Sequence, residues 1–157
     1  MSSKISDCPL CGEHRPLTKE HVYPQWMLRD WGAKPIWIGP TLSVMRDLVV
    51  PVCRTCNAWM NKRFETPTMP LLRSLVAGTE RVITPKQQLP LSLWRTKTIM
   101  MYDIAADPNL ITPNPNYIEF RRTGKPIPRS RLWLGRRVDV ADGVAGGSAT
   151  KLSTALR

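Results

Sequence analysis

The chain has 157 residues and carries 23 Lys and Arg against 12 Asp and Glu, a formal net charge of +11. This length predicts a single domain with a modest core. No apolar run reaches the roughly 18 residues that a membrane span needs, and the polar start of the chain does not resemble a secretory signal. We therefore expect a soluble protein in the cytoplasm of a bacterial or phage-infected cell, with a polyanionic partner and no membrane partner.

The first part of the chain predicts one helix and two strands. Apolar residues at helical spacing indicate a helix over residues 24–32. Residues 36–38 and 42–52 are typical of strands, and Pro51 should end the second of them.

Two short helices should follow. Asn57 is a good N-cap for a helix over residues 57–64, which Pro67 and Pro70 would then limit. The next helix is expected over residues 71–77.

The second half predicts one long helix and then irregular structure. Pro85 fits the first position of a helix that extends to about Ala106, with Pro90 near its start. A loop over residues 107–117 and short strands over 117–120 and 132–134 should follow.

The four cysteines form two pairs with the spacing of metal ligands. Cys8-Pro-Leu-Cys11 and Cys53-Arg-Thr-Cys56 each leave two residues between the sulfurs, so one tight turn can present both thiolates to one ion. We expect one structural zinc ion per chain, in a closed site without a catalytic position. The alternative is four ordinary buried or free cysteines.

A second group of residues has the chemistry of a hydrolytic site. The zinc ion would bring the stretch around His21 close to the helix at Asn57. Glu20 and Asn57 offer the oxygen ligands that Mg²⁺ or Mn²⁺ prefers, and a neutral imidazole is a plausible general base. Asn61 and Glu65 either support this site or simply cap and solvate their helix. The alternative for His21 is a polar strand residue without a special role.

The order of these motifs resembles the HNH endonucleases, the ββα-metal nucleases, and among them the phage endonuclease VII type with a four-cysteine zinc. The likeness covers about residues 8–66. It implies that His21 is the general base and that Glu20 and Asn57 hold a catalytic Mg²⁺ or Mn²⁺. It also implies that Asp47 lies near the position of the family's middle Asn, whose side chain holds the loop of the metal site by hydrogen bonds.

The implied function is metal-dependent hydrolysis of phosphodiester bonds in DNA, which leaves 5′-phosphate and 3′-hydroxyl ends. The alternative is a non-catalytic, zinc-stabilised nucleic-acid-binding module. Two departures from the family pattern favour it: Glu20 stands where many relatives have Asp, and Asp47 stands near the position of the family's Asn. A virion or partner-binding protein with a purely structural zinc is a third hypothesis.

Basic residues are the expected contacts to nucleic acid, DNA rather than RNA. Seven of them lie between Arg121 and Arg137, a stretch without Asp or Glu, and phosphate contact there competes with the simpler reading of a solvated basic loop. The full expected set is Lys19, Arg54, Lys62, Arg121, Arg122, Lys125, Arg129, Arg131, Arg136 and Arg137. The oligomeric state stays open, a dimer included.

Together these features predict an α+β fold. A small zinc-stabilised ββα-metal core would occupy residues 1–66, and a helical extension over residues 67–110 would pack on it. A basic, Pro-rich extension over residues 111–141 and a disordered tail over residues 142–157 would complete the chain.

Overall fold

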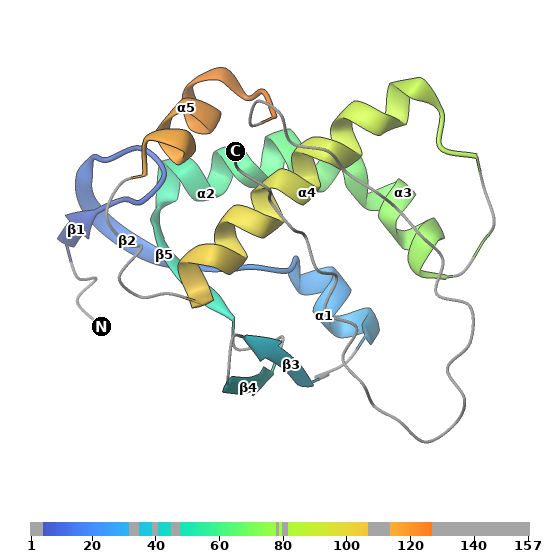
Figure 1. Cartoon of the computed structure of the whole chain (residues 1–157), viewed down its shortest axis with the longest axis horizontal. Helices are drawn as coiled ribbons and strands as arrows, with labels where there is room; N and C mark the ends of the chain where they lie inside the picture. Colours follow the sequence, from blue (N-terminus) through green and yellow to red (C-terminus); the bar gives the residue numbers. More distant parts are fainter. Residues whose placement is uncertain are drawn as a thin grey trace, which may run out of the picture.

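The computed structural model describes residues 5–31, 35–38, 41–44, 48–77, 79, 82–106 and 114–126. The first elements in chain order are β1 (Ile5–Asp7), β2 (His14–His21), α1 (Gln25–Trp31), β3 (Pro35–Ile38), β4 (Thr41–Val44) and β5 (Val49–Cys53). The helical part follows with α2 (Arg54–Met60), the π-helical turn η2 (Asn61–Glu65), α3 (Thr66–Val76), α4 (Pro85–Ala106) and α5 (Pro115–Thr123) (Figure 1). The predicted α+β class is thus confirmed.

An antiparallel sheet with the strand order β1-β2-β5 forms the first layer. Its register places Leu17 of β2 opposite Cys53 of β5 and His21 opposite Val49. The prediction of one strand over residues 42–52 was wrong, because β4 pairs with β3 in a separate two-stranded sheet. Pro51 lies inside β5 and does not end it. Because β5 is an edge strand, main-chain N–H groups on its outer side form no hydrogen bonds within the sheet. A proline, which has no N–H, is tolerated at such a position.

The helix that begins after β5 extends further than the prolines suggested. It runs from Arg54 through η2 to Val76, so Pro67 and Pro70 do not end it. Pro67 follows η2, where the Thr66 amide donates to the Asn61 carbonyl five residues back, so its missing N–H falls at a local change of the helical hydrogen-bond pattern. Asn57 is an interior residue of α2, and the N-cap is Cys53, whose sulfur accepts a hydrogen bond from the Cys56 amide at 3.4 Å.

The C-terminal elements are helices. The expected helix from Pro85 to Ala106 is confirmed as α4. The strand expected over residues 117–120 was wrong, and so was the end of the loop before it, because α5 occupies residues Pro115–Thr123. Asn114 caps this helix and Gly124 ends it with a φ of 62°. These two caps outweigh the strand preference of the aromatic residues. The strand expected over 132–134 and the tail lie outside the described residues.

Helix α4 crosses the molecule and packs against β5, η2 and α3 (Figure 1). Its buried residues Leu93, Met100 and Met101 join Val50 and Val52 of β5 in one core. Helix α5 is part of the same body, because the ring of Phe120 stacks on that of Phe64 at 5.2 Å. None of the helices in the described ranges is long and apolar enough to cross a membrane.

Candidate functional site

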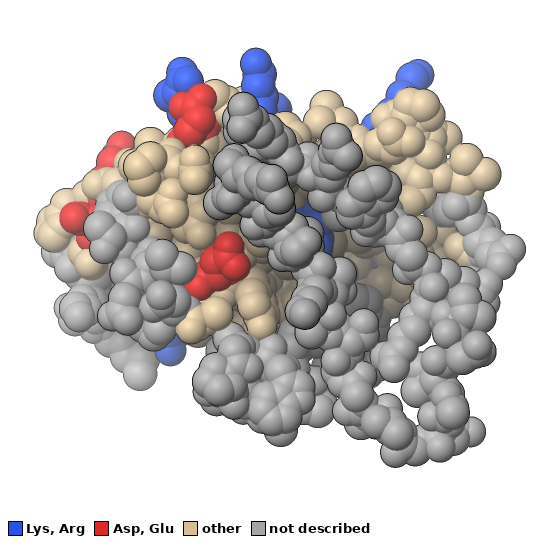
Figure 2. All heavy atoms as spheres, viewed as in Figure 1, with Lys and Arg blue, Asp and Glu red and all other residues tan. Residues whose placement is uncertain are grey.

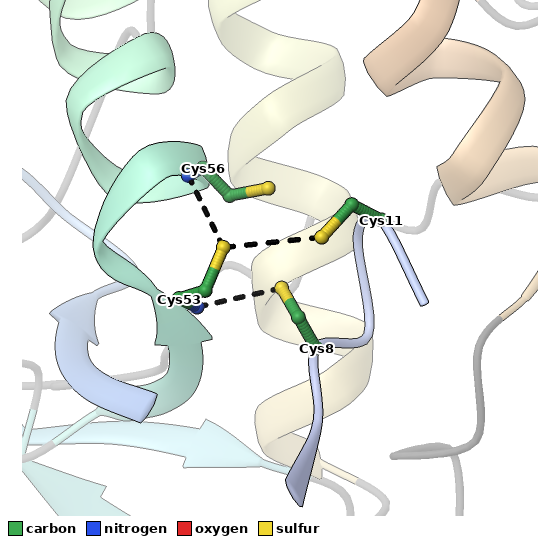
Figure 3. Close-up of side chains that lie close together, drawn as sticks. All are labelled: Cys8, Cys11, Cys53 and Cys56. Carbon is green, nitrogen blue, oxygen red and sulfur yellow. Dashed lines mark hydrogen bonds between the residues drawn. The ribbon is translucent and has the colours of Figure 1, made fainter. Parts of the chain in front are cut away.

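The two cysteine pairs converge on one point (Figure 3). Cys8 and Cys11 lie in the turn between β1 and β2, Cys53 ends β5, and Cys56 stands in the first turn of α2. Their four sulfur atoms lie within 4.8 Å of one another, and those of Cys11 and Cys53 are 3.8 Å apart. The prediction that these four residues are placed to hold one metal ion is therefore confirmed. They form the only convergent group of three or more His, Cys, Asp or Glu side chains within the described ranges.

Three thiols of this cluster have a pKa that differs from the ordinary value for cysteine. A hydrogen bond from the Cys56 thiol lowers the pKa of Cys8 to about 4, and the main-chain amide of Cys53 adds a bond to the same sulfur at 3.4 Å. Burial raises the pKa of Cys11 to about 11, and the bond to Cys8 raises the pKa of Cys56. The cluster therefore resists the loss of all four protons until a cation balances the thiolates, and zinc suits such a set of sulfur ligands.

A basic side chain stands beside the cluster. Arg121 of α5 lies over the Trp59 ring, 4.6 Å from its centroid, and its guanidinium is near enough to Cys56 to lower the pKa of that thiol. A positive charge has this effect because it stabilises the thiolate. Arg121, which the sequence suggested as a phosphate contact, is thus half-buried beside the cysteine cluster.

A second cluster surrounds the ammonium group of Lys97, which α4 carries into the core. The Lys97 side chain has no exposed surface, and its Nζ lies 2.6 Å from a Glu65 carboxylate oxygen and 3.5 Å from one of Glu20. The ammonium also donates to the main-chain oxygens of His21 and Val22 at 3.4 and 3.3 Å. One buried cation therefore connects η2 with the end of β2.

Glu20 and Asn57 meet in this second cluster. Asn57 directly follows Cys56 in α2, and its side chain lies near enough to the Glu20 carboxyl group to lower the pKa of that group. Burial raises the pKa of Glu20 to about 7, although Lys97 and Asn57 favour its charged form, and the nearby charge of Glu65 raises it further. The structure thus brings together three of the expected site residues, Glu20, Asn57 and Glu65.

The candidate base adjoins the cluster through its main chain. His21 is half-buried and is the last residue of β2. It lies opposite Val49, whereas Glu20 lies opposite the buried Val50, so strand alternation directs the two side chains to different faces of the sheet. The carbonyl group of His21 is the part that Lys97 contacts.

The supporting residue Asn61 lies elsewhere, since it is exposed and accepts a hydrogen bond from the Thr66 hydroxyl at 3.1 Å. His14, the second histidine of the chain, forms an exposed ion pair with Asp7 at 2.9 Å, outside the cysteine cluster. Asp47 lies outside the described residues.

The expected phosphate contacts are only partly described. Lys19, Arg54, Lys62, Arg122 and Lys125 are exposed. Figure 2 shows basic side chains projecting from the edge formed by α5, with acidic ones beside them, and Arg122 pairs with Glu119 there at 2.8 Å. Arg129, Arg131, Arg136 and Arg137 lie outside the described residues.

The sequence assigned no role to Lys97, although the pattern around it contains a signal. Leu93, Met100, Met101 and Lys97 share one helical stripe, because they are three or four residues apart. A lysine on an otherwise apolar stripe faces the core, and a buried ammonium needs a carboxylate partner. Glu20 and Glu65 were the available carboxylates of the metal-site region.

The raised pKa of Glu20 predicts an unusual pH dependence of stability. Between its ordinary pKa of 4.5 and the folded value of about 7, the folded chain holds a proton that the unfolded chain releases. Stability is therefore complete below the ordinary pKa and is lost as the pH rises through the folded pKa. In buffer without added divalent ions, we expect the free energy of unfolding to fall by about 1 kcal/mol from about pH 6 to about pH 8.

Urea titrations of the wild type and Glu20→Gln check this expectation. Because the variant has no proton to lose at this position, the difference between the two stabilities should carry the whole slope. A constant difference between the two proteins over that pH range would contradict the assignment.

Comparisons with protein-family models, with curated proteins and with solved structures return no match for this chain.

Proposed function

We propose that the protein is a metal-dependent endonuclease of the HNH type that hydrolyses phosphodiester bonds in DNA. The supporting observation is the approach of the Asn57 side chain to Glu20, on the helix that begins in the cysteine cluster. Cys56 and Asn57 are neighbours in α2, so a structural zinc ion on the four sulfurs would fix the helix turn that presents the Asn57 amide to Glu20. The order of these residues in the sequence resembles the HNH pattern.

The oxygen donors suit one hard cation. A carboxylate and an amide oxygen are typical ligands of Mg²⁺ and Mn²⁺. Lys97 is close to Glu65 at 2.6 Å but more distant from Glu20 at 3.5 Å. The two carboxylates are almost equally exposed, Glu20 at 12% and Glu65 at 13% of the side chain, so the longer distance to Lys97 is what leaves Glu20 the freer of the two to bind an ion. Glu20 and Asn57 would hold that ion, which would supply positive charge next to the scissile phosphate.

The chain's own groups would then carry out the proton transfer. The imidazole ring of His21 would take a proton from a water molecule that reaches past the end of β2, since His21 and Glu20 face opposite sides of the sheet. The oxygen of that water would form a bond to phosphorus as the bond from phosphorus to the 3′ oxygen breaks. The leaving 3′ oxygen would gain a proton from solvent, which leaves a 3′-hydroxyl and a 5′-phosphate.

A plasmid-nicking assay tests this proposal. We expect the wild type to convert supercoiled DNA to open circles with Mg²⁺ or Mn²⁺, and His21→Ala to lower the rate by at least about a hundredfold, because general base catalysis contributes roughly that much. The half-buried position of His21 predicts that the variant keeps its zinc and its fold. A wild type that cleaves neither DNA nor RNA with any divalent ion, or a fully active variant, would refute the proposal.

One observation favours a second candidate, a nucleic-acid-binding module without catalysis. The Lys97 ammonium already places a positive charge between Glu20 and Glu65. If that charge suffices for the fold, the same scaffold can bind DNA without a second metal ion. Binding of DNA without cleavage in the same assay would support this function.

A further inference from the structure

We propose that Lys97 is a positioning residue, whose ammonium group fixes Glu20 and the peptide of His21 at the end of β2. This inference rests on the proposed function and adds a role for a residue of α4, a helix outside the predicted core of residues 1–66. The closest carboxylate to Lys97, Glu65, then acts through Lys97 and not as a metal ligand.

Lys97 is fully buried, so the fold must supply polar partners for its ammonium group. The whole side chain is inaccessible to solvent, and the residue is 1% exposed. A lysine charge at such depth is costly unless oxygen atoms replace the water around it. Here two carboxylates and two carbonyl oxygens do so, at 2.6 to 3.5 Å.

The partners of Lys97 come from elements that the proposed reaction must hold together. Glu65 belongs to η2, which continues the helix of Asn57. Glu20, His21 and Val22 belong to the end of β2 and the residue after it. The β2 backbone is also held at this end by its pairing with β5 and by the bond from the Val22 amide to the Leu48 carbonyl at 3.0 Å. Without Lys97, this end of the strand would lose its ion pair and hydrogen bonds to α4, and the link through Lys97 to η2.

Lys97→Met tests the role, because methionine has nearly the same length without the charge. Thr98→Val is the matched control. Thr98 is equally buried at the next position of α4, and its hydroxyl donates a hydrogen bond to the Trp94 carbonyl of its own helix. The double variant Lys97→Met with Glu65→Gln removes both charges of the closest pair, so it leaves a smaller charge imbalance if the single variant fails to fold.

Amide hydrogen exchange gives a readout that does not depend on activity. We expect exchange at Val22 to rise at least about tenfold in Lys97→Met and in the double variant, relative to the β5 amides, and not in Thr98→Val, because a local opening loses charged hydrogen bonds. In the cleavage assay, kcat should fall and the KM for DNA should stay constant. Equal exchange in all variants, or a fall in stability with no local change at Val22, would overturn the positioning role.

The proposed function and the proposed role of Lys97 can be refuted independently of each other. A wild type that cleaves no nucleic acid would refute the proposed function. The exchange at Val22 would still decide whether Lys97 fixes the end of β2.

Discussion

Replacing Cys53 with serine is expected to leave the purified chain without zinc and largely unfolded. Serine is itself a good N-cap, so the first turn of α2 keeps its cap and the change removes a metal ligand alone. Structural zinc contributes roughly 10–16 kcal/mol to the folding of small zinc-dependent domains, which matches or exceeds the total stability of about 5–15 kcal/mol that most domains have. Circular dichroism and metal analysis of the same sample measure both losses.

Thr55→Ser is the control for this prediction, because Thr55 is exposed and lies between the ligands Cys53 and Cys56. It should keep one zinc ion per chain and the thermal transition of the wild type. A folded Cys53→Ser protein, or a folded wild type that contains no metal, would show that the cysteine cluster does not hold the fold.

Replacing Asn57 with leucine is expected to prevent binding of the proposed catalytic ion and to reduce cleavage by more than about a hundredfold. Mutation of residues that only hydrogen-bond the ligands of a metal site already lowers activity by up to that factor. Leucine is close in size and favours helices, so α2 should persist. The half-buried position of Asn57 also makes a loss of folding unexpected. Nicking rates at saturating Mn²⁺ check the result.

Thr55→Leu on the same helix is the matched control, since it adds leucine at an exposed position. Cleavage that is lost equally in both variants would point to a general effect on α2. Cleavage that survives in Asn57→Leu would remove Asn57 from the metal site.

Spacing in the sequence predicted the cysteine cluster because covalent geometry leaves few choices. Two residues between cysteines place both sulfurs on one turn, and the pairing of β2 with β5 brings the two turns together. The same logic led to Asn57 beside Glu20, because Asn57 directly follows Cys56 and Glu20 lies on β2, the strand that follows Cys11 and pairs with β5.

Tertiary contacts decided what the sequence could not. Prolines at 67 and 70 were expected to limit the helix, yet it continues to Val76, because Leu71 and Leu72 gain burial in the core by extending it. The aromatic residues of α5 favoured a strand locally, but capping by Asn114 and stacking of Phe120 on Phe64 select a helix. Arg121 was grouped with the basic stretch, and only the packing of α5 on Trp59 places it beside Cys56.

If Glu20 and Asn57 form one site for a divalent ion, a Mn²⁺ titration followed by electron paramagnetic resonance should find one bound Mn²⁺ per zinc-loaded wild-type chain. Glu20→Gln and Asn57→Leu should bind none. A wild type that binds no Mn²⁺, or variants that bind it as tightly as the wild type, would show that these two residues do not form such a site.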